Sequence, residues 1–308
     1  MVVTTGFFDG VHLGHRFVIE RLVSEAARRG CRSLVVTFWP HPRTVLQDGA
    51  RGLHLLSSLE EKKQALYALG VDQVEVLEFD KAFSRLTAEE YLRTYVREHF
   101  GGEVVLLGYD HRLGCDRPSA ERLRDIALAA GLEPVMAGKC PVDVSSTLIR
   151  KALAQGDVAA ANRMLGYVYS LRGVVVAGNR LGRTIGFPTA NMKLYDPLKM
   201  VPSNGVYEVQ VETVGGQFRG MCNIGLRPTV SQNTIPTIET NIFDFDQDIY
   251  GLDIKVSFVR KIRDEVKFSS LEALAAQLAR DKELINKKLF VYLHTVQGSA
   301  GQAELLFD

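Results

Sequence analysis

The sequence has no excess of basic residues. Lysine and arginine total 37 and aspartate and glutamate total 36, which gives a formal net charge of +1. Proteins that bind nucleic acid or anionic membranes usually carry clustered positive charge, so this balance argues against both kinds of partner. The sequence gives no indication of an oligomeric state.

A long apolar run is also absent. No stretch approaches the ~18 apolar residues of a membrane-spanning helix. Asp9, His12 and His15 stand where a signal peptide would be apolar. We therefore expect a cytoplasmic protein without a membrane partner.

Cysteine is scarce, and the 4 cysteines have no CxxC or other metal-like spacing. Cys31, Cys115, Cys140 and Cys222 therefore predict reduced, isolated thiols. The glycine clusters are not followed by Gly-Lys and a hydroxyl residue, which excludes a Walker A loop.

Apolar strand patterns alternate with helical patterns from residue 1 to about residue 166. Strands are expected at residues 2–5, 33–39, 74–79 and 103–108. This alternation indicates parallel strands joined by right-handed crossovers, in a Rossmann-like doubly wound α/β sheet. Ligands of such sheets bind at the carboxyl ends of the strands.

The pattern changes to all-β near residue 166. Short strands separated by Gly, Pro and Asn turns are expected at residues 168–177, 206–213, 217–224, 237–243 and 253–259, and a helix follows to about residue 289. A small closed β-barrel with a C-terminal helix accounts for this pattern, because closure removes sheet edges. We expect one domain at residues 1–166 and a second at residues 167–308.

Residues 6–15 (GFFDGVHLGH) follow the first strand and lead directly into a helix. The glycines and the helix N-terminus predict an anion site, and His12 and His15 lie on one side of the helix entrance where a triphosphate can meet them. Zinc is an alternative ligand of the histidine pair, although no third ligand has suitable spacing. The candidate phosphate-binding residues here are Gly6, Phe8, Asp9, Gly10, Gly14, His12 and His15.

Residues 144–150 (VSSTLIR) open a later helix with Ser145, Ser146 and Thr147, and Arg150 follows one turn on. The hydroxyls and the N-terminal amides suit phosphate, and the guanidinium of Arg150 can bind two phosphate oxygens. An ordinary serine N-cap is the alternative, and it explains one serine.

Residues 178–191 (GNRLGRTIGFPTAN) combine glycines, arginines and oxygen ligands. Gly178 and Gly182 let backbone amides approach an anion, and Arg180 and Arg183 stand beside them. The oxygens of Thr189 and Asn191 suit Mg²⁺, which takes few protein ligands together with phosphates and water. A glycine-rich turn before a strand is the alternative.

Strand alternation in IETNI sets the direction of a carboxylate. Ile238 and Thr240 belong to one face of the strand, and Glu239 and Asn241 belong to the other. Glu239 can therefore point toward a substrate, or it is a solvated strand residue.

Several of these strings resemble one protein family. Residues 182–191, 223–229 (NIGLRPT) and 237–251 (TIETNIFDFDQDIYG) resemble the riboflavin kinase domain. The strings GFFDGVHLGH, TFWPHP, GYDHRLG and VSSTLIR resemble the nucleotidyltransferase domain of the bacterial bifunctional riboflavin kinase/FAD synthetases. The resemblance covers nearly the whole chain, with the motifs in the family's order.

The resemblance implies two reactions that use ATP and Mg²⁺. The first domain would adenylylate FMN, with His12, His15 and Arg150 at the triphosphate and His41 facing it. The second would phosphorylate riboflavin, with Glu239 as the general base. The resemblance also suggests flavin or nucleotide contacts, with Asp110 and Asp157 in the first domain and Arg227, Arg263 and Glu265 in the second.

The sequence departs from the family pattern at two motifs. In the first motif, Leu113 stands where an aromatic residue is usual, and Cys115-Asp116-Arg117 stand where basic residues are common. In the second, Asn241 replaces a usual histidine. Two other functions stay open. The first domain could be a degenerate scaffold beside a single kinase, or the chain could be a non-catalytic flavin-binding regulator. The intact histidine and SSTLIR motifs argue against the scaffold, and Glu239, Thr189 and Asn191 together argue against the regulator.

Overall fold

The computed structural model describes residues 1–46, 53–109, 111–178, 181–228 and 234–296; for residues 181, 227, 228, 234, 235 and 288–296 it describes the backbone alone. The chain forms two compact units, Met1–Ser146 and Thr147–Asp308. In the described residues no helix is long and apolar enough to cross a membrane.

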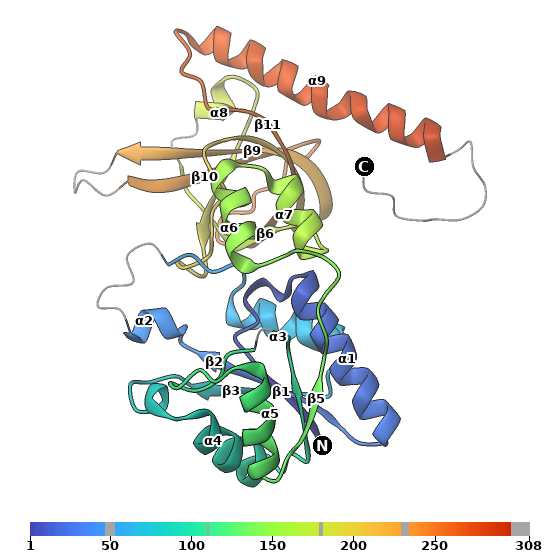
Figure 1. The fold of residues 1–308 in the computed structure, drawn as a ribbon. Coiled ribbons are helices and arrows are strands. Elements are labelled where there is room, and N and C mark those ends of the chain that lie inside the picture. The colour runs from blue at the N-terminus through green and yellow to red at the C-terminus, as the bar shows by residue number, and fades with distance from the viewer. Residues whose placement is uncertain (47–52, 110, 179–180, 229–233, 297–308) are drawn as a thin grey trace. The chain divides into compact units, whose positions relative to one another are not determined.

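The first unit is built on a parallel sheet (Figure 1). Its described strands are β1 (Val2–Thr5), β2 (Ser33–Trp39), β3 (Gln73–Glu78), β4 (Val104–Leu107) and β5 (Glu133–Met136), in the order β3-β2-β1-β4-β5. The strand order runs outward in both directions from β1, so β1 and β4 flank a switch point. The doubly wound sheet predicted from the sequence is confirmed.

Both faces of this sheet are buried, as is usual for parallel sheets. Successive residues of a strand point to opposite faces. Val2 and Val35 pack against α1 (Leu13–Arg29) and α3 (Leu59–Ala68), whereas Val3 and Val36 pack in the cluster on the other face. The remaining described helices of the unit are η1 (Asp9–Val11), α2 (Pro42–Leu46), η2 (Phe83–Arg85), α4 (Ala88–Tyr91), η3 (Leu92–His99) and α5 (Ala120–Ala129).

The second unit contains a closed antiparallel barrel with the strand order β10-β7-β6-β11-β8-β9. The described strands are β6 (Ser170–Val176), β7 (Ala190–Leu194), β8 (Gly205–Thr213), β9 (Gly216–Pro228), β10 (Thr234–Ile242) and β11 (Asp253–Arg263). The described helices are α6 (Ser146–Gln155), which begins at the unit boundary, α7 (Val158–Leu165), α8 (Leu181–Thr184) and α9 (Leu271–Val296). The predicted architecture, a closed barrel with a C-terminal helix, is confirmed, whereas strand β7 was not among the predicted strands (Figure 1).

Helix α7 packs with the barrel, although its sequence pattern belongs to the alternating first half. The Asn162 side chain donates to the Phe258 carbonyl at 2.9 Å and accepts from the Tyr169 amide at 2.7 Å. These bonds tie α7 to β11 and to the start of β6. The compact units therefore divide at Ser146–Thr147, about twenty residues before the change of pattern near residue 166.

Candidate functional sites

The loop of residues 6–15, here called the glycine loop, leaves the carboxyl end of β1 and enters α1. Phe8 has φ 50°, Gly10 79° and Val11 38°, all in the left-handed region that glycine tolerates best. Asp9 fixes this conformation from within the protein. Its Oδ1 accepts from the Leu56 amide at 2.9 Å and from the Ser57 amide at 3.1 Å. The Asp9 carboxylate therefore shapes the loop, and its role in ATP binding stays a prediction.

His12 and His15 lie together at the start of α1. Their rings stack with centroids 3.6 Å apart, and His12 Nδ1 accepts from the His15 amide at 3.3 Å. Because Nδ1 is an acceptor, a neutral His12 carries its proton on Nε2. The prediction from the sequence spacing that the two imidazoles lie together is therefore correct.

His15 is held in its neutral form. The pKa of His15 lies well below the usual 6.5. Burial is the largest cause, and His12 and Lys62 lower it further. Two stacked imidazolium ions would also repel each other. The Nδ1 atom of His15 is buried and has no hydrogen-bond partner. His15 is therefore neutral, and together with His12 it can donate N–H groups to an anion.

The other residues predicted around this loop divide into three groups. A Cβ on Gly14 would lie 3.2 Å from the His12 ring, and one on Gly6 would lie 3.0 Å from the Phe8 ring, so both glycines allow close packing. His41 contacts the Phe7 ring edge-on at 4.1 Å, and Ser146 donates to the Asp9 carbonyl at 3.1 Å. The roles of Ser145, Thr147 and Arg150 in this site stay predictions.

A cavity of about 730 Å³ opens beside the glycine loop at the carboxyl ends of β1 and β2. Its lining is aromatic and basic: Gly6, Phe7, Phe38, Phe79, Phe83, Tyr91, His111, Arg112, Leu113, Cys115 and Arg117 take part. We call it the aromatic cavity. Leu113 and Cys115, at which the chain departs from the family pattern, belong to this wall. Asp110 lies outside the described residues.

Most residues of this wall were not predicted from the sequence as site residues. Phe79 directly follows β3, and Phe83 lies in η2. The rule that ligands gather at strand carboxyl ends was the available signal, and it could have singled out Phe79.

In the barrel, Glu239 stands in a row of polar side chains. It is the direct cross-strand partner of Asn191 on β7 and of Asn223 on β9. Directly opposed residues share one face of a sheet. Thr189 precedes Asn191 by two positions and joins the same face. Glu239, Asn191 and Thr189 were predicted from the sequence as site residues, whereas Asn223 was not.

Glu239 lines a cavity of about 280 Å³, here called the Glu239 cavity. Asn223, Asn241, Arg263 and Glu265 also reach it, and the apolar wall consists of Ile185, Phe187, Val206, Met221, Val266, Phe268, Leu274 and Leu278. Asn241 donates to the Pro188 carbonyl at 2.6 Å. Arg263 is held by Asp281 of α9, with its Nε and Nη2 each 2.9 Å from Oδ2.

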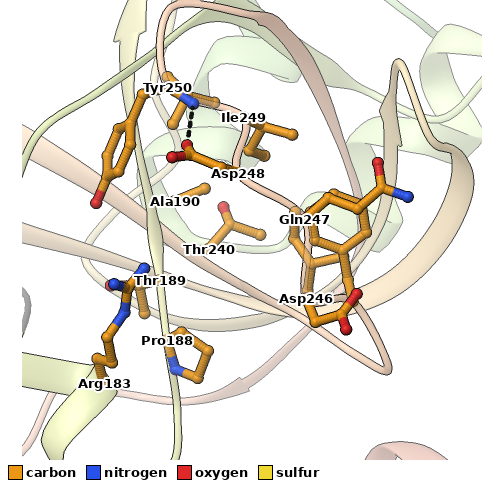
Figure 2. A pocket seen from close by; sticks show the side chains of 13 residues that line it. Arg183, Pro188, Thr189, Ala190, Thr240, Asp246, Gln247, Asp248, Ile249 and Tyr250 are labelled. Carbon is orange, nitrogen blue, oxygen red and sulfur yellow. Dashed lines mark hydrogen bonds between the residues drawn. The ribbon is translucent and has the colours of Figure 1, made fainter.

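A second barrel cavity, of about 410 Å³, contains more polar groups (Figure 2). Arg183, Thr189, Thr240, Asp246, Asp248 and Tyr250 line it. The Tyr250 amide donates to Asp248 Oδ1 at 3.1 Å, which orders this end of the cavity. Thr189 lines both barrel cavities and therefore lies where they approach each other.

The oxygens of Thr189 and Asn191 fit a hard cation. A Cβ on Gly178 would lie 2.2 Å from the Asn191 Nδ2, so only glycine leaves room for this side chain. No group of three His, Cys, Asp or Glu with metal-site geometry occurs among the described residues. A cation here would therefore depend on these oxygens and on ligand phosphates.

Four further predictions have less support from the structure. Asp157 accepts from the Ala160 amide at 2.9 Å and is the N-cap of α7. A Cβ on Gly182 would lie 2.1 Å from the Phe187 carbonyl oxygen, so the α8 turn requires glycine there. Arg180 lies outside the described residues, and for Arg227 only the strand backbone is described.

The chain is similar to proteins of known activity along nearly its whole length. An FAD synthetase family model matches residues 1–147, and a riboflavin kinase family model matches residues 165–289. Proteins described as bifunctional riboflavin kinase/FMN adenylyltransferase are similar. The one from Listeria monocytogenes is 36% identical over 92% of this chain and 90% of its own length. The one from Escherichia coli is 37% identical over 94% and 92%.

A solved structure is similar as well. A Streptococcus pneumoniae protein described as a macrolide-efflux protein is 35% identical and has a TM-score of 0.84, over 92% of this chain and 93% of its own.

Proposed function

The chain belongs to the family of bifunctional riboflavin kinases/FMN adenylyltransferases, and from this premise we propose how its own residues divide the two reactions. The protein phosphorylates riboflavin to FMN and adenylylates FMN to FAD, with ATP as the donor in both steps. We assign the adenylyltransferase to residues 1–166 and the kinase to residues 167–308.

The kinase assignment depends on one observation: Thr189 lines both barrel cavities, and Glu239 lines the more apolar one. A flavin ring suits the apolar walls of the Glu239 cavity, with Arg263 and Glu265 at its edge. The polar cavity with Arg183 suits ATP. Glu239 then accepts the proton of the ribityl 5′-hydroxyl as that oxygen attacks the γ-phosphorus.

Thr189 and Asn191 would hold Mg²⁺ in the kinase site. The ion, when bound, neutralises charge on the transferring phosphate groups. Asn223 and Asn191 are the direct cross-strand neighbours of Glu239, on the same face of the sheet. The backbone around Gly178 and Gly182 lies close to this site, and we propose that it contacts the ATP phosphates.

The adenylyltransferase site combines the glycine loop and the aromatic cavity. The isoalloxazine ring of FMN suits the aromatic walls, and Arg112 and Arg117 suit its phosphate. That phosphate attacks the α-phosphorus of ATP, and pyrophosphate leaves. His12 and neutral His15 donate to the triphosphate, while the glycine loop and the α1 N-terminus bind its oxygens. Arg150, Ser145, Ser146, Thr147 and His41 complete the proposed phosphate contacts.

The small substrates and the balanced charge support a cytoplasmic enzyme without nucleic-acid or membrane partners. The test is to incubate the purified chain with riboflavin, ATP and Mg²⁺ and to separate the flavins by chromatography. FAD supports two working sites. FMN alone would indicate a degenerate first domain, and unchanged riboflavin would indicate a binding protein.

A further inference from the structure

We propose that Lys62 is a positioning residue of the adenylyltransferase site, which holds the glycine loop in its phosphate-binding shape from the side of α3. The inference depends on the proposed function of residues 6–15. Lys62 is absent from the sequence-based site because it lies within a charged run, Glu60 to Lys63, that is typical of a solvated helix face.

The Lys62 side chain is buried within the first unit. Only 2% of its surface is exposed, and Nζ donates to the Phe7 carbonyl and to Thr37 Oγ1, both at 2.9 Å. The ammonium group also lies 4.2 Å from the centre of the Phe7 ring. Its neighbour Lys63 is 33% exposed and lies 3.9 Å from Glu60. Burial of an ammonium group costs free energy unless its N–H groups are hydrogen-bonded. The bonds to Phe7 and Thr37 therefore fix the position of Lys62 Nζ beside the glycine loop.

The position of the Lys62 ammonium group allows it to hold the backbone of the glycine loop. Phe7 directly precedes the strained residues Phe8 to Val11, and strained backbone persists only where the surroundings fix it. Lys62 fixes the carbonyl before this segment, and Asp9 is fixed by the Leu56 and Ser57 amides just before α3. Residues 56–62 therefore form a platform for the loop.

Lys62 also acts on the histidine pair. Among the described residues, His12 and Lys62 are the charged or titratable groups that lower the pKa of His15 after burial itself. Burial lowers the pKa of Lys62 to about 8, and the Asp9 carboxylate opposes this by favouring the charged ammonium. Loss of the Lys62 charge would let the pKa of His15 rise. The protonated form would then appear at higher pH in the variant than in the unchanged chain.

The test is Lys62→Met, with Lys63→Met as the matched control, in the full chain. We expect Lys62→Met to lower kcat for FAD formation from FMN and ATP at least tenfold, and to move the acid limb of that rate to higher pH. FMN formation from riboflavin should not change, and Lys63→Met should behave as the unchanged chain does. A rate loss without movement of the acid limb, or no rate loss, would overturn the proposal.

Two further measurements separate other outcomes. If Lys62→Met unfolds the first unit, Thr37→Val decides, because it removes the hydroxyl that accepts from Lys62 Nζ and donates to the Phe7 carbonyl at 3.2 Å, while the Lys62 charge stays in place. A several-fold loss of kcat is then expected, and an unchanged kcat overturns the proposal. If the unchanged chain forms no FAD, the proposed function itself fails, independently of Lys62.

Discussion

Glu239 and Asn191 are direct cross-strand partners on β10 and β7, and Thr189 shares their face two residues before Asn191. The proposed base and both proposed cation ligands therefore occupy one patch of barrel wall. Under the proposed function, proton transfer and phosphate binding would share this patch, and mutation can separate the roles of the three residues.

Glu239→Gln should abolish riboflavin phosphorylation while leaving adenylylation intact. An amide cannot accept the hydroxyl proton, so we expect the FMN-forming kcat to fall by a factor on the order of 10²–10⁴. FAD formation from supplied FMN is the internal control. An equal loss of both reactions would contradict separate sites.

Replacement of Asn191 should change the Mg²⁺ requirement of FMN formation. Asn191→Leu removes an oxygen ligand, so the Mg²⁺ concentration for half-maximal rate should rise about tenfold or more. Asn191→Asp keeps an oxygen and should show a smaller change. Titration of both reactions with Mg²⁺ checks this, and identical curves for the two variants would argue against a cation ligand.

Arg112→Ala should weaken FMN binding in the adenylyltransferase site. Arg112 lines the aromatic cavity, and loss of a phosphate partner should raise the KM for FMN several-fold. The exposed Arg122 on α5 gives the matched variant Arg122→Ala, for which we expect no change. Steady-state kinetics of FAD formation distinguishes the two, and equal effects would indicate general electrostatics.

Acid should destabilise the first unit through His15. The folded-state pKa of His15 lies below the usual 6.5, so the unfolded chain binds this proton first as the pH falls. The contribution of neutral His15 to the free energy of unfolding is therefore complete above about pH 6.5. Below that pH it decreases by about 1.4 kcal/mol per pH unit for one proton. Thermal unfolding of the unchanged chain and of His15→Leu between pH 7 and 5 measures the difference. Parallel pH dependences would contradict the sign.

Asp281→Asn should disturb the Glu239 cavity from outside it. Asp281 is 3% exposed and is the partner of Arg263, and loss of one member of a buried pair costs about 3–5 kcal/mol. We expect a higher KM for riboflavin and a lower unfolding temperature of the second unit. Glu283→Gln, on an exposed pair of the same helix, is the control. If riboflavin KM stays unchanged, Arg263 has no part in flavin binding.

The sequence alone determined the features that depend on near neighbours. Alternation of strand and helix patterns predicted the parallel sheet, and the change of pattern near residue 166 predicted the barrel. The spacing of His12 and His15 predicted one imidazole pair, because residues three apart at a helix start share a side. The alternation around Glu239 predicted its face for the same local reason.

Only the tertiary structure decided which distant residues meet. The strand register brings Asn223 and Asn191 to Glu239, and the fold turns Lys62 from a surface pattern into a buried contact of Phe7. It also packs α7 with the barrel and gathers Phe79, Phe83 and Arg112 into one cavity. Such contacts minimise the free energy of the whole chain, through burial and hydrogen bonds between segments far apart in sequence, and no local spacing encodes them.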